Sequence, residues 1–72
     1  DESIDDCTEA IRLNPQLADA YNHRGFAKFN KGKKEEAKED FKKYLELTKN
    51  KKDAQIQQFR QQILQTFPEL GK

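Results

Sequence analysis

Two stretches of this chain resemble each other at a fixed spacing of 34 residues. The first runs from Ser3 to Leu13 and the second from Ala37 to Leu47, and their apolar positions coincide. Self-similarity with a period of roughly 20 to 50 residues is typical of proteins built from stacked repeats. Because such repeats usually present a surface, the pattern favours a binding function and leaves the partner unidentified. In this register Cys7, Ala10, Ile11 and Leu13 correspond to Phe41, Tyr44, Leu45 and Leu47.

The composition predicts an all-α fold. Of the 72 residues, 33% are hydrophobic and 38% are charged. The hydrophobic share is low for a compact globular domain but normal for helical repeats with wide solvated faces. Helix-forming residues dominate, valine is absent, and no run alternates with the two-residue period of a strand. A chain of this length buries only about 60% of its unfolded surface, so we expect modest stability.

The spacing of apolar residues predicts about four helices. The first ends before Pro15, because the residue preceding a proline is disfavoured in the helical region. Gly32 supplies the left-handed residue between the second and third helices, and either Asn50 or Asp53 can cap the fourth. Lys33 is a poor N-cap, so the third helix relies on packing. The predicted spans end near residue 13 and then cover about residues 18–31, 34–48 and 53–66.

The fourth predicted helix has one apolar stripe and a glutamine-rich remainder. A single stripe on an otherwise neutral polar helix suits a lid that closes an open stack and faces water on its outer side. Pro68 ends the pattern, and we expect Glu69 to Lys72 to fray. The stripe consists of Ile56, Phe59, Ile63 and Phe67.

The segment Ala18–Asn50 resembles a tetratricopeptide repeat. The chain departs from the family pattern at Arg24, Lys28, Tyr44 and Lys49, where leucine, tyrosine, alanine and proline are usual. The missing proline at Lys49 fits a terminal repeat. The resemblance rests on an early aromatic residue, two glycines, small residues, a second aromatic residue and a closing apolar pair: Tyr21, Gly25, Ala27, Gly32, Ala37, Phe41, Leu45 and Leu47.

This resemblance implies antiparallel helical hairpins stacked as a fragment of an α-solenoid, at the C-terminal end of a longer array. Residues 1–14 are then the second helix of a preceding repeat, residues 15–50 one complete repeat, and residues 51–72 a capping helix with a tail. Gly25 opposite Ala37 lets the two helices of the repeat approach closely. Since about three repeats are normally needed for stability, we expect the isolated chain to be marginal.

The resemblance also implies a binding groove along the first helix of the repeat, which lines the concave face. Such a groove takes an extended peptide or a partner helix. Phe26 is either an anchor for that partner or packs against another helix, and both interpretations remain open. His23 lies beside the groove and is interpreted as a surface or packing residue. The implied inward positions are Asp19, Asn22, Phe26, Phe29 and Asn30.

Some members of the family grip the acidic C-terminal tail of chaperones with asparagines and basic residues from three successive first helices. Only one complete repeat is expected here, and His23 and the glutamine-rich last helix do not reproduce that clamp, although Asn22 is a possible member. Arg24 and Lys28 are basic but are expected to point elsewhere. We therefore do not expect binding of chaperone tails.

An enzymatic function is not expected. Ser3 is the only serine and His23 the only histidine, so the chain holds no Ser/His/Asp set. Cys7 and His23 are too few to hold a metal, and isolated glycines form no phosphate loop, so we expect no metal and no cofactor. The single cysteine cannot form an intrachain disulfide, and its place in the apolar pattern indicates a small buried side chain. A chain without disulfides is compatible with a reducing compartment such as the cytoplasm but does not require one.

Two alternatives stay open beside a protein or peptide partner. The acidic first helix and the lysine-rich middle are suited to pair between chains in a homo-oligomeric scaffold. Nucleic-acid binding ranks last, because the lysines of the third helix alternate with acids such as Asp40, which indicates a solvated face. No membrane span is predicted, since no run approaches about 20 apolar residues. The lysine-rich turns contain Lys31, Lys33, Lys34, Lys49, Lys51 and Lys52.

Overall fold

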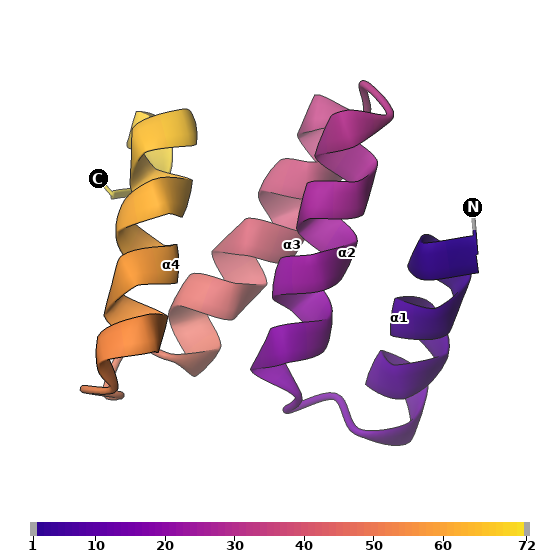
Figure 1. The fold of residues 1–72 in the computed structure, drawn as a ribbon, viewed down its shortest axis with the longest axis horizontal. Coiled ribbons are helices and arrows are strands. Elements are labelled where there is room, and N and C mark those ends of the chain that lie inside the picture. Colours follow the sequence, from indigo (N-terminus) through magenta and orange to yellow (C-terminus); the bar gives the residue numbers. More distant parts are fainter. Residues whose placement is uncertain (1, 72) are drawn as a thin grey trace.

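A computed structural model describes residues 2–71, which form four α-helices and no strand (Figure 1). The prediction of an all-α fold is confirmed, and each helix lies within two residues of its predicted bounds. The elements are α1 (Glu2–Leu13), α2 (Ala18–Asn30), α3 (Lys34–Leu47), α4 (Ala54–Thr66) and the short 3-10 turn η1 (Pro68–Gly71).

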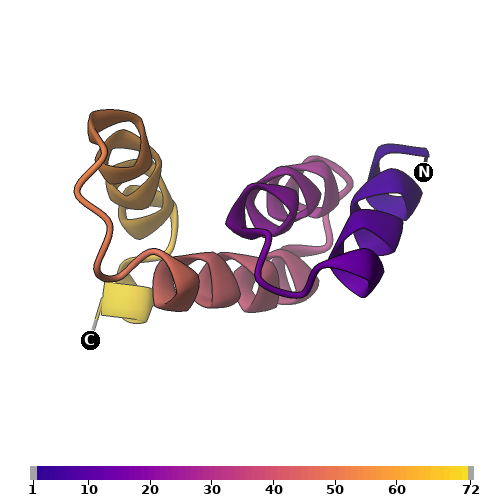
Figure 2. The ribbon, with the colours of Figure 1, turned by 90° about the horizontal axis from the view of Figure 1, so that it is seen from below.

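The helices pack as neighbouring pairs. The central pair is the antiparallel hairpin of α2 and α3, with α1 beside α2 and α4 at the other end of the row (Figure 1). Seen from below, α3 runs across the molecule, and α2 and α4 lie on the same side of it (Figure 2). This arrangement of helical hairpins is the predicted fold class.

The ends of the helices follow the local chemistry. Gly32 has a φ of +83°, so it provides the left-handed residue predicted between α2 and α3. Lys33 precedes α3 and caps it with no side-chain hydrogen bond, as expected. Asp53, rather than Asn50, caps α4, because its Oδ1 accepts the backbone N–H of Gln55 at 2.9 Å.

The core lies between α2, α3 and the C-terminal half of α4. Phe41 is its centre, only 1% exposed, and its ring contacts Phe26 edge-on at a centroid distance of 5.0 Å. Phe67, at the end of α4, lies 5.7 Å from the same ring. The buried residues that form this cluster are Tyr21, Ala37, Phe41, Tyr44, Ile63 and Phe67.

Gly25 allows the close approach of α2 to α3. A Cβ atom at this position would lie 2.7 Å from Cε1 of Phe41, which is shorter than real contacts allow. The predicted role of Gly25 in close packing is therefore correct. The side chain that comes nearest to Gly25 is Phe41, one helical turn beyond Ala37.

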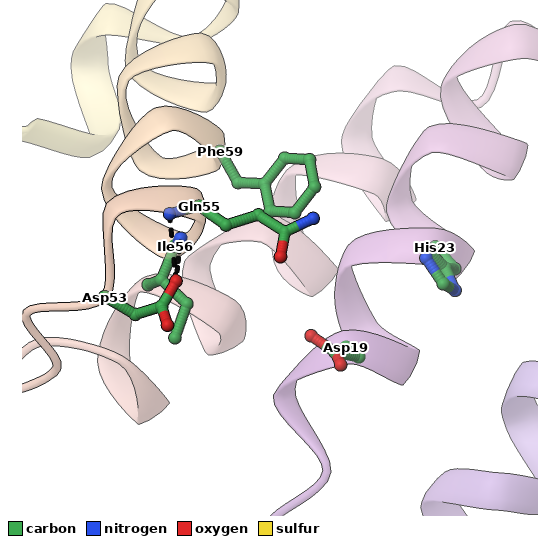
Figure 3. A pocket seen from close by; sticks show the side chains of 6 residues that line it. All are labelled: Asp19, His23, Asp53, Gln55, Ile56 and Phe59. Carbon is green, nitrogen blue, oxygen red and sulfur yellow. Dashed lines mark hydrogen bonds between the residues drawn. The ribbon is translucent and has the colours of Figure 1, made fainter.

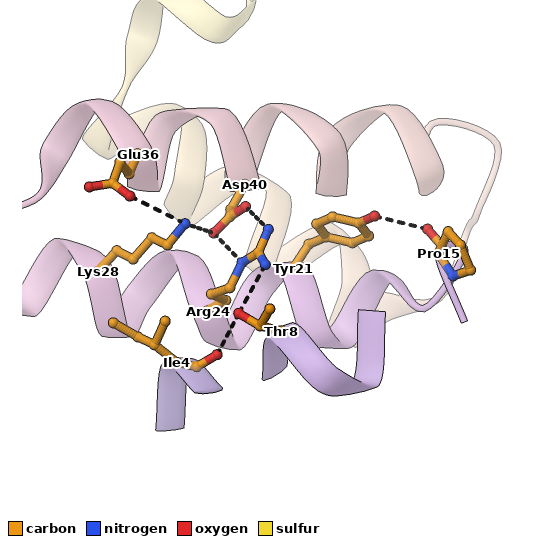
Figure 4. A network of polar contacts seen from close by, with 8 residues as sticks. All are labelled: Ile4, Thr8, Pro15, Tyr21, Arg24, Lys28, Glu36 and Asp40. Atoms are coloured by element: carbon orange, nitrogen blue, oxygen red, sulfur yellow. Dashed lines mark hydrogen bonds and ion pairs between the residues drawn. The ribbon is translucent and has the colours of Figure 1, made fainter. Parts of the chain in front are cut away.

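A polar network centred on Arg24 of α2 and Asp40 of α3 joins α1, α2 and α3 (Figure 4). Arg24 donates from Nε and Nη2 to the two carboxylate oxygens of Asp40 at 2.9 and 2.7 Å, and from Nη1 to the hydroxyl of Thr8 at 3.2 Å. Lys28 Nζ lies 3.4 Å from Asp40 Oδ2. Asp40 is only 4% exposed, so its assignment to a solvated face is wrong. The two cations are what make burial of that carboxylate tolerable.

The C-terminal tail is ordered through Gly71, which contradicts the expectation that it frays. Pro68 begins the turn η1, and Leu70 packs against the core. Lys38 Nζ on α3 lies 3.1 Å from the Glu69 carboxylate and 6.0 Å from the Phe67 ring centroid. Lys72 lies outside the described residues.

The first helix gives reason to expect low stability. None of the residues of α1 is buried, and its apolar positions are only half-buried against α2. We expect the isolated chain to melt below about 45 °C in calorimetry or to dimerise through α1, because few contacts oppose the loss of chain entropy. A monomer by light scattering that melts well above this temperature would contradict the expectation.

Replacement of Gly25 tests the close approach. In a helix interior Gly→Ala normally stabilises by up to about 1 kcal/mol, but here the added methyl group overlaps Phe41, and we expect Gly25→Ala to lower the free energy of unfolding by about 1–3 kcal/mol. Urea titration followed by circular dichroism measures the change. The double variant Gly25→Ala, Phe41→Leu is the control, since a smaller side chain should make the two effects less than additive.

Candidate binding groove

One face of α2 borders two hollows. Its residues Asp19, His23, Phe26 and Asn30 follow one another at spacings of four, three and four, which places them on one side of a helix. Each of these four residues lines at least one hollow. His23 lines both hollows and is the residue that their linings share. We call the two hollows together the groove.

The first hollow lies between α2 and α4 and has a volume of about 320 Å³. Figure 3 shows Phe59 and Gln55 extending from α4 toward Asp19 and His23 on α2. The wall formed by α4 therefore presents an aromatic ring and an amide, and the facing wall formed by α2 presents a carboxylate and an imidazole. The lining residues are Asp19, His23, Asp53, Gln55, Ile56 and Phe59.

The second hollow lies between α1 and α2 and has a volume of about 460 Å³. It is bounded by a carboxylate from Asp6 on α1 and by the half-buried ring of Phe26 on α2. Cys7 also lines it, and burial raises the pKa of its thiol above the ordinary value, so the thiolate is disfavoured. The lining residues are Ser3, Asp6, Cys7, His23, Phe26, Ala27 and Asn30.

The apolar stripe of α4 packs in the core at its C-terminal end and lines a hollow at its N-terminal end. Ile63 and Phe67 are 1% and 6% exposed and belong to the core. Ile56 and Phe59, in the first half of the same helix, are only half-buried and line the hollow between α2 and α4. The lid is therefore anchored by its C-terminal half, and its N-terminal half forms a wall of the groove.

Two buried polar atoms of the hairpin have no hydrogen-bond partner among residues 2–71. They are Oδ1 of Asn22 and the hydroxyl of Tyr44, on side chains that are 2% and 0% exposed. Burial raises the pKa of the Tyr44 phenol above its ordinary value, and Asp19 and Asp53 raise it further while Arg60 opposes them. The hydroxyl therefore lies within the field of the two groove carboxylates.

The five predicted groove residues occupy three different environments. Asp19, Phe26 and Asn30 line the hollows. Asn22 is buried between them and offers no free surface, and Phe29 packs edge-on against Phe67 at 5.8 Å, where it supports α4. The ring of Phe26 packs on Phe41 of α3, rather than on α4, and it also lines a hollow, so its role as an anchor stays a prediction.

The residues missed by sequence reasoning come from the neighbouring elements. His23 was placed beside the groove, and it lies at its centre. Ile56 and Phe59 were assigned to the core stripe, and Asp53 only to helix capping. The i, i+4 spacing of Asp19 and His23 is the one sequence signal that points to the face of α2 that borders the hollows.

The basic residues of the repeat lie away from the groove. Arg24 and Lys28 point to Asp40, as expected (Figure 4). The two lysine-rich turns lie at opposite ends of the α2–α3 hairpin (Figure 1). Within residues 2–71 no three His, Cys, Asp or Glu side chains gather as a metal-binding group, and no helix has the length and hydropathy of a bilayer-spanning segment.

Comparison with known proteins identifies the repeat. Residues 18–51, which include α2 and α3, match the family model described as a tetratricopeptide repeat. This chain belongs to the tetratricopeptide repeat family. Proteins of this family are generally protein–protein interaction modules and typically non-catalytic.

Three curated proteins are similar to this tetratricopeptide repeat chain. Human RNA polymerase II-associated protein 3 is 45% identical over 49 residues, which cover 68% of this chain. Small glutamine-rich tetratricopeptide repeat-containing protein 2 of Saccharomyces cerevisiae is 40% identical over 47 residues, or 65% of the chain. Heat shock protein STI1 of the same yeast is 34% identical over 74 aligned residues, or 97% of the chain.

The chain spans only 7%, 14% and 13% of the lengths of these three relatives. No solved structure matches the chain significantly. The comparisons therefore identify the tetratricopeptide repeat and the general class of its function.

The two tyrosines of the core provide a matched test of the unpartnered hydroxyl. Tyr44→Phe removes a buried group with no partner, so we expect the free energy of unfolding to stay constant or rise by about 1 kcal/mol. Tyr21→Phe removes a hydroxyl that donates to the Pro15 carbonyl at 3.0 Å and should cost about 1 kcal/mol. Urea denaturation of both variants measures the difference. Equal losses would mean that the Tyr44 hydroxyl is hydrogen-bonded in solution.

Proposed function

We propose that this tetratricopeptide repeat chain binds an extended peptide or a partner helix in the groove along α2. The observation that carries the proposal is the face of α2 itself. Asp19, His23, Phe26 and Asn30 lie in one row, with a hollow on each side of that row. A continuous row of mixed aromatic and polar side chains is the kind of surface that recognises a peptide.

The dimensions of the groove favour a chain-like ligand over a compact small molecule. Each hollow has the volume of a few side chains, and the two are joined at His23 rather than enclosed. A segment that crosses α2 would place one side chain against Phe59 and another against Phe26. Polar neighbours such as Gln55 and Asn30 are positioned at the edges, where they can bond to the backbone of the segment.

A selection experiment tests the proposed site. We expect random 12-residue peptides displayed on phage to yield binders to the 72-residue chain, because the groove offers half-exposed aromatic rings beside hydrogen-bonding groups. Amide chemical-shift changes on titration with the selected peptide should include Asp19, His23 and Phe59. Shifts confined to the outer face of α3, or no enrichment of any peptide, would contradict the proposal.

Two alanine variants at exposed positions compare the groove with a control surface. His23→Ala removes the residue shared by both hollows, and we expect the affinity for the selected peptide to fall about fivefold, or roughly 1 kcal/mol. Lys42→Ala, on an exposed position of α3 outside both hollows, should leave the affinity within about twofold. Equal losses in the two variants would point to a site other than the groove.

Self-association is the second candidate function, favoured by the exposure of α1. This helix has no buried residue, and the hollow beside it contains Phe26 and Cys7. A helix from another copy that covered α1 would bury these side chains. Sedimentation at increasing concentration measures this, and a sedimentation coefficient independent of concentration would argue against it.

A further inference from the structure

We infer that the groove selects a basic segment, anchored by an arginine or lysine side chain between Asp19 and Asp53. This inference rests on the proposed function, because it names the chemistry of the partner in the same groove. Three carboxylates line the two hollows, on Asp6, Asp19 and Asp53. Among the described residues no lysine or arginine lines either hollow, although the chain has 14 of them.

The nearby cations are engaged elsewhere. Arg24 and Lys28 project from α2 to Asp40, on the other side of the helix from the groove row (Figure 4). Arg60 of α4 donates to the Leu45 carbonyl at 2.7 Å and to the Thr48 hydroxyl at 2.8 Å, below the wall formed by Phe59. None of these cations lines the groove. The negative charges of its carboxylates therefore have no cation in the lining, although Asp53 Oδ1 already accepts the backbone N–H groups of Gln55 and Ile56.

The polar groups in the lining of the first hollow are complementary to the same ligand. They are the carboxylates of Asp19 and Asp53, the amide of Gln55 and the imidazole of His23. The carboxylates can only accept hydrogen bonds, and the amide offers one acceptor oxygen. A guanidinium, which has only donors, therefore complements most of the polar groups of this hollow.

The aromatic wall favours the same ligand. Phe59 extends from α4 toward Asp19, so a cation between them meets a carboxylate on one side and a ring on the other (Figure 3). Arginine stacks on aromatic rings and binds carboxylates with two parallel hydrogen bonds, whereas an acidic side chain is repelled by Asp19 and Asp53.

Three matched peptides test the inference directly. Each is a fluorescein-labelled 12-residue peptide with the same leucine and serine positions, and its four remaining positions are all arginine, all glutamine or all glutamate. Fluorescence anisotropy at physiological salt should give the arginine peptide an affinity for the chain at least about tenfold above that of the glutamate peptide, with the glutamine peptide between them.

Two charge-matched variants separate the groove from general attraction. In Asp19→Asn, Asp53→Asn we expect the affinity for the arginine peptide to fall about tenfold, and asparagine keeps the cap of α4. Glu39→Gln, Glu46→Gln removes the same charge from exposed positions of α3 outside both hollows and should change the affinity by less than about twofold. Circular dichroism melting confirms that both variants fold alike.

The outcomes separate this inference from the proposed function. Equal affinities for the three peptides, stronger binding of the glutamate peptide, no binding of the arginine peptide, or equal losses in the two variants would each overturn the basic anchor. The proposed groove would survive these results if peptides selected without regard to charge still shift Asp19, His23 and Phe59. It fails together with the anchor only if those shifts are absent as well.

Discussion

The contact between Gly25 and the ring of Phe41 is the constraint on which the other helices depend. Without a side chain on Gly25, α2 approaches α3 closely enough for the ring to be almost fully buried. The same ring contacts Phe26 on α2 and Phe67 at the end of α4. One aromatic side chain thus fixes both the hairpin and the anchored end of the lid.

The two sides of α2 have opposite characters. On one side Arg24 and Lys28 surround the buried carboxylate of Asp40, with Arg24 also reaching Thr8 on α1. Breaking such a buried pair typically costs about 3–5 kcal/mol, so it holds three helices in one relative position. On the other side the carboxylate of Asp19 faces a hollow without a cation in its lining. The pairing that stabilises the hairpin therefore also leaves the groove acidic.

The sequence predicts the helices better than it predicts what each apolar residue contacts. Periodicity places Ile56 and Phe59 in one stripe with Ile63, and all three were expected to be equivalent. The structure fully buries only the end of that stripe, because Ile63 and Phe67 belong to the core, while Ile56 and Phe59 pack against it half-buried. A stripe shows which side of a helix is covered, but how completely each residue is covered depends on its tertiary neighbours. The burial of Asp40 was missed for another reason, because alternating charges indicate a solvated face and its cationic partners come from α2.

Two buried polar groups of the hairpin break the rule that buried polar atoms are hydrogen-bonded. By resemblance to the family, Tyr44 occupies a position usually held by alanine, and here its fully buried hydroxyl has no partner within residues 2–71. Asn22 Oδ1 on α2 is in the same situation. Each such group costs about 1–3 kcal/mol, which is a large sum for a chain with so small a core. The buried carboxylate of Asp40 shows no comparable cost, since both its oxygens accept hydrogen bonds from Arg24. Neither Tyr44 nor Asn22 lines a hollow, so these costs belong to the packing of the hairpin, and the acidic lining of the groove is a separate feature of the molecule.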